Sequence, residues 1–357
     1  MILALIAYLH GNGGAERQIT MLANEMSKRG HEVHFLIIAE YSKRYPISER
    51  VIIHDLTKYD GSFLTPILGR FYALRNVYKT IKPDITIHFN VQSAYLTVAL
   101  PKRIYGKAIY SERGDPYDDE YSGLLRHLRD WMVKKVDGLV FQSEGARDFF
   151  PAHIIKKSII IHNSVAVPVD RYPISSSRKK VITSAGRLHP QKNYLLLIKA
   201  FIKISEDYPD YQLIIYGDGE LRNDLQKYIN AQDMIDRITL APACVDLWDR
   251  IVDASLFVLS SDFEGMPNAL MEAMALGVPC VSTDCRPGGA RTLINNGING
   301  FVVPCGDVDA LAEKMSFVLS HPEVSQKISQ GGRKIAYTHD VDNTYDKWET
   351  YIEFCCK

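Results

Sequence analysis

Short apolar runs alternate with longer stretches of helical periodicity along the first half of the chain. Several of the runs are rich in β-branched residues and apolar at consecutive positions, as in strands that helices cover on both faces. The predicted strands are 2–8, 32–39, 51–55, 84–89, 107–111 and 138–142. The predicted helices between them include 15–29, 64–82 and 124–135. This alternation of strands and helices predicts a parallel, doubly wound sheet.

The alternation stops at 165–180, where two prolines and a serine triplet without helical period indicate a linker between domains. It then resumes. The strands predicted for the second half are 181–185, 212–216, 238–240, 256–260, 279–283 and 300–303, and a last helix follows at 343–354. We predict an α/β protein with two doubly wound, Rossmann-like domains. They comprise residues 1–168 and 169–337. Ligands of open α/β sheets bind beyond the carboxyl ends of the strands, which predicts a site in a cleft between the domains.

Composition narrows the class of protein. The 357 residues suit two domains, and 42 Lys and Arg balance 42 Asp and Glu, so no overall charge favours nucleic acid as a partner. No apolar run is long enough to span a bilayer. The first segment lacks a basic start and continues into a glycine-rich loop, which predicts a buried strand rather than a signal peptide. All 6 cysteines fall late in the chain without a CxxC pair, which favours free thiols in a cytoplasmic protein over disulfides or a zinc site.

The segment 260–277 contains a candidate anion site. A buried strand is predicted to end early in this segment, and Pro267 suits the first position of the helix that follows. Asn268, Ala269 and Leu270 would then present backbone N–H groups at the helix N-terminus. Unpaired donors and the positive end of the helix dipole coincide there, which favours a phosphate group.

Charged side chains surround this predicted anion site. Glu264 precedes the helix and Glu272 lies about one turn inside it, where carboxylates could accept hydrogen bonds from ribose or hexose hydroxyls. Acidic residues also favour a helix start on their own, so the pair leaves both interpretations open. Arg187 and Lys192 lie in the loop 184–193, after the first strand of the second domain. They could stabilise a departing diphosphate, although a solvated basic loop explains two lone cations equally well.

A glycine turn at 216–220, Tyr-Gly-Asp-Gly-Glu, follows the next strand. Gly217 and Gly219 would let the backbone approach a ligand closely. In this order and spacing, the motifs of the second domain resemble those of the retaining glycosyltransferases of family 4, which have the GT-B fold. The E-x7-E pattern, the Gly-Arg…Gln-Lys-Asn loop and the Gly-Asp-Gly-Glu turn all match. So do Gly-Gly-Ala-Glu-Arg at 13–17 and Pro-Cys-Val-Ser-Thr at 279–283.

The resemblance covers nearly the whole chain. It implies two domains that face each other across a cleft, with a C-terminal helix at 338–357 that returns to the first domain. The segment 111–116, Ser-Glu-Arg-Gly-Asp-Pro, is similar to that of the bacterial branch that builds surface polysaccharides. The resemblance assigns Glu272 to the ribose hydroxyls and Glu264 to the donor sugar. Four further residues are assigned to the donor's phosphates or sugar: Arg187, Lys192, Gly13 and Gly14.

Two assignments depend on weaker matches. The loop 241–245 is expected to border the base. Many family members have a histidine in the first-domain loop where this chain has Glu112 and Arg113, and we expect these two residues to position acceptor or donor. His10 and His88 are alternative candidates for that imidazole, and a structural role explains each of them as well.

The resemblance also implies transfer with retention at the anomeric carbon. A departing phosphate oxygen can accept the proton of the acceptor hydroxyl, so no strong protein base is needed, and no nucleophile motif is present. We expect no metal and no other cofactor. The triplets Asp-x-Asp at 307–309 and 340–342 precede helical runs, and we interpret both as helix N-caps.

Two predicted helices, 64–82 and 122–135, interleave basic with apolar residues. Such helices can lie on anionic lipid, which would suit a polyprenyl-linked acceptor and a location at the inner face of the plasma membrane. Ordinary sheet-covering helices with solvated basic faces explain the same pattern. The expected partners are a nucleotide-sugar donor, with UDP favoured by family frequency, and a glycan or polyprenyl-linked acceptor.

Two other functions remain open at this point. An NAD-dependent oxidoreductase would use the glycines of 11–16 after the first strand and Glu40 after the second. Glu16 replaces the third glycine of that fingerprint, and the motifs of the second domain stay unexplained. A non-catalytic nucleotide-sugar-binding protein of the hinge type would usually carry an export signal, which this sequence lacks.

Overall fold

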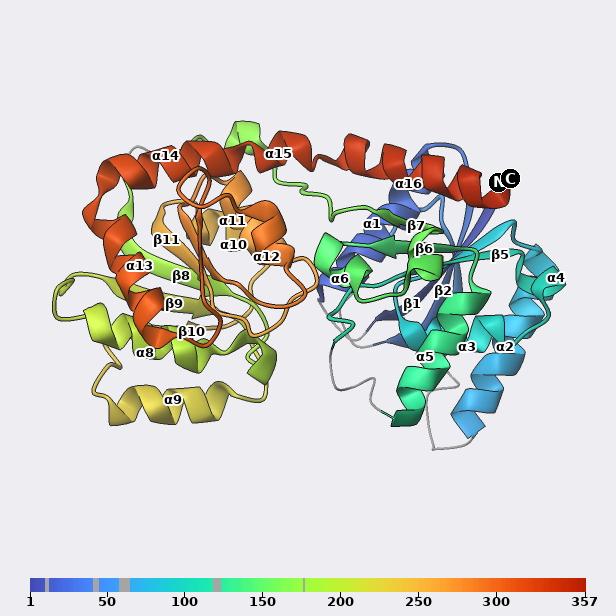
Figure 1. Ribbon diagram of the computed structural model, residues 1–357, viewed down its shortest axis with the longest axis horizontal. Coiled ribbons are helices and arrows are strands. Elements are labelled where there is room, and N and C mark those ends of the chain that lie inside the picture. The colour runs from blue at the N-terminus through green and yellow to red at the C-terminus, as the bar shows by residue number, and fades with distance from the viewer. Residues whose placement is uncertain (10–12, 41–44, 58–64, 118–122, 176) are drawn as a thin grey trace. The chain divides into compact units, whose positions relative to one another are not determined.

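The computed structural model describes the chain except residues 10–12, 41–44, 58–64, 118–122 and 176 (Figure 1). Its contacts divide the chain into two units. The first unit comprises Met1–Ser164 with Val341–Lys357, and the second comprises Val165–Asp340. The sequence analysis places these boundaries after residues 168 and 337. The C-terminal helix therefore belongs to the same unit as the N-terminal sheet.

The first unit is built on a 7-stranded sheet in the order β3-β2-β1-β4-β5-β6-β7, in which every neighbouring pair is parallel. Its strands are β1 (Ile2–Leu9), β2 (Glu32–Glu40), β3 (Ile52–Asp55), β4 (Ile85–His88), β5 (Lys107–Ser111), β6 (Gly138–Phe141) and β7 (Ser158–Ile160). The six strands predicted for this half are confirmed, and β7 was not predicted. Its apolar run is short and lies between short helices, which hid it from the sequence pattern.

Helices cover both faces of this sheet. They are α1 (Gly14–Lys28), α2 (Thr65–Ile81), α3 (Val91–Val98), α4 (Lys102–Tyr105), α5 (Gly123–Lys135), α6 (Glu144–Asp148), α7 (Ala152–Ile155) and α16 (Val341–Cys356). Successive residues of β1 alternate between two cores, with Leu3 and Leu5 packed in the core of α1 and α16, and Ala4 and Ile6 in that of α2, α3 and α5. Burial on both faces explains why β1 is apolar at consecutive positions.

The C-terminal helix α16 is a structural part of the first unit. Trp348 is buried and stacks on Phe89 with ring centroids 5.6 Å apart. Tyr351 Oη donates to Lys157 O at 2.6 Å and accepts from Leu139 N at 2.9 Å. A Cβ at Gly138 would lie 2.7 Å from that hydroxyl, so β6 needs a glycine where α16 crosses it. The predicted return of the C-terminal helix to the first domain is confirmed.

The second unit has a 6-stranded parallel sheet in the order β10-β9-β8-β11-β12-β13. The strands are β8 (Lys179–Ala185), β9 (Gln212–Tyr216), β10 (Ile238–Ala241), β11 (Ala254–Leu259), β12 (Cys280–Thr283) and β13 (Phe301–Val303). The helices are α8 (Tyr194–Ile204), α9 (Arg222–Ala231), α10 (Leu247–Ile251), α11 (Asn268–Ala275), α12 (Gly289–Leu293), α13 (Val308–Ser320), α14 (Pro322–Arg333) and α15 (Ile335–Thr338). The prediction of two doubly wound α/β sheets is confirmed.

The predicted linker 165–180 is partly wrong. Val165 and Val167 are buried in the core of the second unit, a short 3-10 helix forms at Val169–Arg171, and β8 already begins at Lys179. This segment lacks helical period because it packs in an extended form against that core. The 6 cysteines are free thiols, as predicted.

Candidate functional site

The second sheet has its topological switch point between β8 and β11. From β8 the chain continues outward to β9 and β10, and it then returns to the other side of β8 to form β11, β12 and β13. The loops that follow β8 and β11 therefore leave neighbouring strands in opposite directions, and ligands of open α/β sheets bind outside the carboxyl edge at such a point. These two loops carry Lys192 and Glu264.

The structure brings Lys192 and Glu264 together although 72 residues separate them in sequence. The Lys192 ammonium donates to Glu264 Oε1, and Ser261 Oγ donates to the same oxygen at 2.7 Å. The two side chains are only 15% and 9% exposed. A pair this shielded keeps both charges satisfied, and the loss of one partner leaves the other buried and unpaired.

Further hydrogen bonds hold the two loops in register. Asn193 Nδ2 donates to Asp262 Oδ1 at 2.8 Å, and the Asn193 side chain also accepts from Leu196 N as the N-cap of α8. Asp262 N donates to Gln191 O at 2.9 Å. Asn193 has φ 42°, a left-handed conformation that asparagine tolerates better than most residues. The sequence analysis missed Asn193 and Asp262 as residues that position the pair.

Arg187 lies in the same loop as Lys192, and its side chain is exposed. Among the described residues it has no hydrogen-bond or ion-pair partner, whereas Lys192 has one. An uncommitted guanidinium at the switch point can bind an anion without first breaking a protein contact. Its role on a diphosphate stays a prediction.

The N-terminus of α11 also lies after β11. Pro267 is its N-cap and no side chain caps the helix, so the expected position of Pro267 as first helical residue is wrong by one place. Met271 N donates to Pro267 O at 3.1 Å and is thereby satisfied. Asn268, Ala269 and Leu270 form the first turn, as predicted, and their N–H groups point toward the helix N-terminus.

Glu272 is buried in the second turn of α11. Its Oε2 accepts a hydrogen bond from Trp248 Nε1 of α10 at 2.9 Å. This contact fixes the carboxylate and was not expected from the sequence, because the tryptophan lies on a separate short helix. The assignment of Glu272 to ribose hydroxyls stays a prediction.

The glycine turn after β9 packs against the loop after β8. A Cβ at Gly217 would lie 1.8 Å from Gly186 O, and one at Gly219 would lie 2.4 Å from Leu188 O. Contact between two backbones thus explains both glycines, where the sequence analysis expected a close approach to a ligand. Arg222 secures the turn, since its guanidinium donates to Gly217 O, Asp218 Oδ1, Leu240 O and Ala241 O.

The loop 241–245 is joined to this turn. Ala243 N donates to Asp218 Oδ2 at 2.9 Å, while Val245 is fully exposed. The expectation that this loop borders a base stays a prediction.

Glu112 and Arg113 of the first unit follow β5. Glu112 is buried, and its two carboxylate oxygens accept from Tyr110 Oη at 2.9 Å and from the N–H groups of Arg113 and Gly114 at 3.1 Å. Burial raises the pKa of Glu112, and these hydrogen bonds oppose the rise. The contacts give Glu112 a role in shaping its own loop, and its role toward a substrate stays a prediction.

The Arg113 side chain is held within the first unit. Its guanidinium lies 3.7 Å from the centroid of Phe89, the ring that stacks on Trp348, and Nη1 donates to Asn163 Oδ1 at 2.8 Å. Burial lowers the pKa of Arg113 to about 9, so it stays cationic at neutral pH. The predicted pair Glu112–Arg113 is thus mainly engaged by protein groups.

Gly13 is the N-cap of α1 and Gly14 its first residue, with no side-chain cap. A Cβ at Gly13 would lie 2.0 Å from Glu16 Oε2, so the glycine leaves room for that carboxylate. Contact of either glycine with a donor stays a prediction.

Neither histidine candidate gains support from the structure. His10 lies outside the described residues. His88 is fully buried at the end of β4, where Nδ1 lies 3.0 Å from Ser93 Oγ, and burial lowers its pKa to about 3. Ser93 Oγ donates to Asn90 O, so His88 Nδ1 is the donor toward Ser93. His88 Nε2 is then a buried acceptor without a partner among the described residues.

The two Asp-x-Asp triplets behave differently. Asp307 caps α13 by accepting from Ala310 N at 2.9 Å, so the predicted N-cap is confirmed. Asp340 precedes α16, but Asp342 lies inside its first turn, and the expectation that both precede the helix is wrong. In the part of the chain that the structure describes, no three His, Cys, Asp or Glu side chains gather as a metal-binding group. Independence from metal stays a prediction.

Comparisons with known proteins account for both halves of the chain. The model of the family "Glycosyltransferase Family 4" matches residues 12–167, and that of "Glycosyl transferases group 1" matches residues 171–335. The chain belongs to these glycosyltransferases. The resemblance inferred from the sequence motifs is confirmed. Membership of this family argues against the alternative function of an NAD-dependent oxidoreductase.

Of three relatives of this glycosyltransferase, two match over nearly its whole length and one over a shorter part. An uncharacterized glycosyltransferase of Haemophilus influenzae is 25% identical over 94% of this chain and 95% of its own. The "GalNAc-alpha-(1->4)-GalNAc-alpha-(1->3)-diNAcBac-PP-undecaprenol alpha-1,4-N-acetyl-D-galactosaminyltransferase" of Campylobacter jejuni is 23% identical over 96% of both chains. The "UDP-Gal:alpha-D-GlcNAc-diphosphoundecaprenol alpha-1,3-galactosyltransferase" of Escherichia coli is 37% identical over 36% of this chain and 34% of its own. The last two of these relatives are named for undecaprenol-linked acceptors.

Solved structures confirm the GT-B fold. Anabaena HepE in complex with UDP superposes with a TM-score of 0.80 at 18% identity over 99% of both chains. Staphylococcus aureus TarM, in a complex that includes UDP, gives a TM-score of 0.81 at 12% identity over 98% of this chain and 99% of its own.

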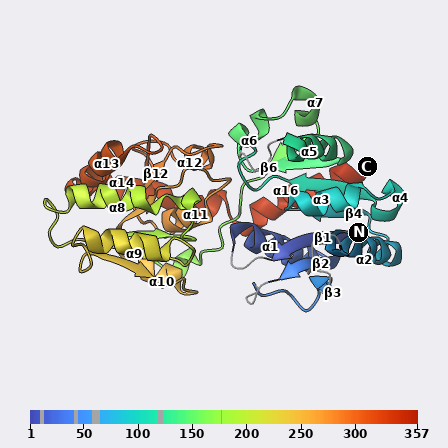
Figure 2. The same ribbon diagram turned by 90° about the horizontal axis from the view of Figure 1, so that it is seen from below.

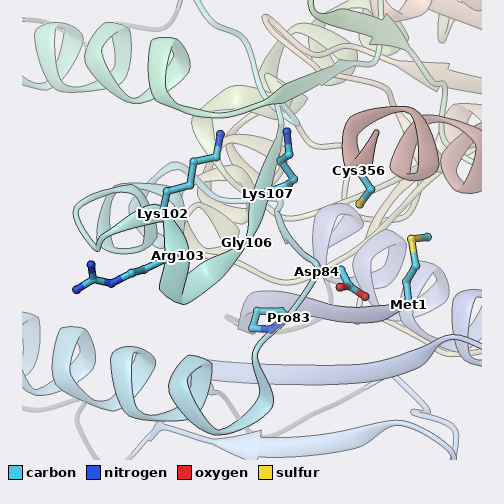
Figure 3. A pocket seen from close by; sticks show the side chains of 8 residues that line it. All are labelled: Met1, Pro83, Asp84, Lys102, Arg103, Gly106, Lys107 and Cys356. Atoms are coloured by element: carbon cyan, nitrogen blue, oxygen red, sulfur yellow. The ribbon is translucent and has the colours of Figure 1, made fainter.

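A hollow of about 580 Å³ lies in the first unit of the glycosyltransferase (Figure 3). It is lined by residues of α4, by the end of α16 and by residues at the amino ends of β1, β4 and β5, the edge opposite to that where ligands of such sheets bind. Lys102 and Lys107, whose side chains point the same way in Figure 3, both pair with Asp137. The Asp84 carboxylate accepts from Ile2 N at 2.7 Å. These charges are engaged by protein groups, so the hollow is not our candidate site. Among the described helices, none has both the length and the apolar character to cross a bilayer.

Proposed function

We propose that this glycosyltransferase moves a hexosyl or N-acetylhexosaminyl group from a UDP-sugar to a glycan or lipid-linked acceptor, with retention at the anomeric carbon. The observation that carries the proposal is the pairing of Lys192 with Glu264 at the switch point of the second sheet, next to the uncapped N-terminus of α11. A diphosphate needs cations and N–H donors, and a sugar needs a carboxylate for its hydroxyls. The loops after β8 and β11 together offer both.

The chemistry follows from what each group can do. The diphosphate gains negative charge as the glycosidic bond breaks, and Arg187, Lys192 and the α11 N-terminus would stabilise that charge. When a diphosphate draws Lys192 away, Glu264 becomes an acceptor for donor-sugar hydroxyls, while Ser261 still satisfies one of its oxygens. The buried Glu272 would accept from the ribose hydroxyls, with its carboxylate oriented by Trp248.

Retention requires the acceptor hydroxyl on the face of the sugar that the diphosphate leaves. In that geometry a departing phosphate oxygen takes the acceptor's proton, and no protein base is required. The proposal includes no metal ion, since two cations and a helix N-terminus would supply the positive charge. Loss of activity with EDTA that manganese restores would count against this part.

UDP is proposed because proteins of similar structure have been solved with UDP, and because one relative is named for a UDP-galactose donor. A lipid-linked acceptor is proposed because two relatives are named for undecaprenol-linked acceptors. These names guide the choice of substrates to test. A cytoplasmic location, at the inner face of the plasma membrane, follows from such an acceptor.

The test is a panel of UDP- and GDP-sugars, first without acceptor and then with undecaprenyl diphosphate sugars. We expect release of UDP from one donor, faster with a suitable acceptor, and a product whose anomeric configuration by NMR equals that of the donor. Binding of nucleotide sugars without turnover would favour the non-catalytic alternative. An inverted anomer would contradict the mechanism, and stabilisation by NAD(H) alone would contradict the proposed donor.

A further inference from the structure

Five large apolar side chains are exposed on two helices of the first unit. On α2, Leu68 and Tyr72 are 60% and 58% exposed. On α5, Leu125, Leu128 and Trp131 are 51%, 40% and 40% exposed. Single exposed apolar residues need no explanation, but a group of this size on one face indicates an interaction surface.

The two helices cover the same face of the sheet. α2, α3 and α5 share one core, with α3 in the middle, and Tyr95 of α3 donates to Leu125 O at 3.4 Å (Figure 2). Both α2 and α5 follow a strand of the sheet, so their N-terminal halves lie toward its carboxyl edge. Four of the five exposed side chains, those of Leu68, Tyr72, Leu125 and Leu128, belong to these halves. We call the outward surfaces of α2 and α5 the α2–α5 face.

The charge of this face differs from that of the whole chain. The chain has 42 basic and 42 acidic residues, but α2 and α5 together contain seven basic residues and one acidic residue. The basic residues are Arg70, Arg75, Lys79, Arg126, Arg129, Lys134 and Lys135. The acidic residue, Asp130, pairs with the buried Arg129 at 3.1 Å. The acidic residues that precede α5, at 118–120, lie outside the described part of the chain.

We infer that the α2–α5 face docks on the surface of a bilayer that contains anionic phospholipid. Leucine side chains would enter the acyl boundary, and Trp131 and Tyr72 suit the headgroup level. The basic residues other than the buried Arg129 would meet lipid phosphates. A second copy of the chain on this face would set six basic residues against six, since the seventh, Arg129, is buried, and the two sets would repel. The inference rests on the proposed function for its purpose, because a lipid-linked acceptor would reach the enzyme at the carboxyl edge.

The experiment is flotation of the full-length protein with vesicles. Phosphatidylcholine vesicles are compared with vesicles that also contain phosphatidylglycerol, at low and at high salt. We expect binding to the anionic vesicles, weakened by salt, and a blue shift of tryptophan fluorescence that Trp131→Phe removes. The double variant Leu128→Ser/Trp131→Ser should bind about tenfold more weakly or worse. The matched control is Ile298→Ser/Tyr337→Ser on the second unit, whose side chains are 58% and 63% exposed, and it should bind like the parent.

Equal weakening in both double variants, or binding that ignores phosphatidylglycerol, would overturn the inference. So would a dimer in solution that Leu128→Ser/Trp131→Ser dissociates, since the face would then be an interface between copies. UDP release from the donor without acceptor separates the two proposals. A protein that floats but turns over no nucleotide sugar contradicts the proposed function alone. A protein that turns over a donor in solution but does not float contradicts the docking face alone.

Discussion

A buried carboxylate follows a strand in each unit of this glycosyltransferase, Glu112 after β5 and Glu264 after β11, and their surroundings differ. Glu112 of the first unit is bonded by groups within two residues of it, which complete a local turn. Lys192 and Glu264 of the second unit come from loops 72 residues apart and meet at a switch point. Arg187 beside them has no partner among the described residues. A carboxylate satisfied by its neighbours organises a loop, whereas a long-range pair beside an uncommitted cation can exchange partners with a ligand.

The largest expected effect comes from breaking the long-range pair. Lys192→Met should lower kcat/KM for sugar transfer about 10²–10³-fold, because a cation on the departing diphosphate is lost. It should also lower Tm, since Glu264 keeps the hydrogen bond from Ser261 but loses its counter-charge in a shielded site. The double variant Lys192→Met/Glu264→Gln removes both charges and should recover Tm but not activity. Recovery of both would reduce the pair to a structural role.

Arg187→Ala should have the next largest effect. The Arg187 side chain makes no hydrogen bond or ion pair among the described residues, so its removal tests ligand binding separately from stability. We expect kcat/KM to fall about a hundredfold, with Tm unchanged. The control is Lys180→Ala, which removes an exposed cation paired with Asp210 at the other end of β8 and should leave activity unchanged. Unaltered kinetics in Arg187→Ala would remove this residue from the site.

Glu112→Gln tests whether the carboxylate of the first unit serves only to organise its own loop. Gln offers only one acceptor oxygen to three donors, so the free energy of unfolding should fall by about 1–3 kcal/mol. Tyr110→Phe removes one donor and keeps the carboxylate, and it should cost less. Chemical denaturation measures both, and kcat per folded molecule should change little. A large loss of kcat at unchanged stability would restore the prediction that Glu112 positions a substrate.

The smallest expected effect concerns His88 and pH. Its pKa is about 3 in the folded protein and about 6.5 when unfolded, so between these values the unfolded chain binds the additional proton. The free energy of unfolding therefore decreases as pH falls below about 6.5. His88→Gln should flatten this dependence in denaturation curves recorded from neutral pH downward. His153→Gln, at an exposed position, should leave the slope as it is; identical slopes for both variants would contradict the assignment.

Much of the fold could be predicted from the sequence because strands buried on both faces are apolar at consecutive positions. β1 and β11 show this clearly. β7 was missed because three residues between short helices give no period. The predicted linker 165–180 was partly wrong because composition alone does not distinguish an extended segment that packs on a core from an extended segment in solvent.

Only those parts of the candidate site that lie in local sequence motifs could be predicted. Glu264, Lys192 and the α11 N-terminus stand in recognisable local patterns. The contacts that orient these residues have no local sequence pattern. Asn193 contacts Asp262, and Trp248 contacts Glu272, only after distant segments of the chain have folded together. Gly217 has a structural explanation in the nearby backbone of Gly186, and its contact with a substrate stays a prediction.

The most direct measurement of the central claim is the affinity for UDP by titration calorimetry. We expect UDP to bind the parent protein and to bind Arg187→Ala/Lys192→Met about a hundredfold or more weakly, because two cations on the diphosphate are lost. The control Lys102→Ala/Lys107→Ala, in the hollow of the first unit, should bind UDP like the parent. Equal affinity of the parent and of Arg187→Ala/Lys192→Met, or loss of affinity in the control, would contradict a donor site at the switch point of the second sheet.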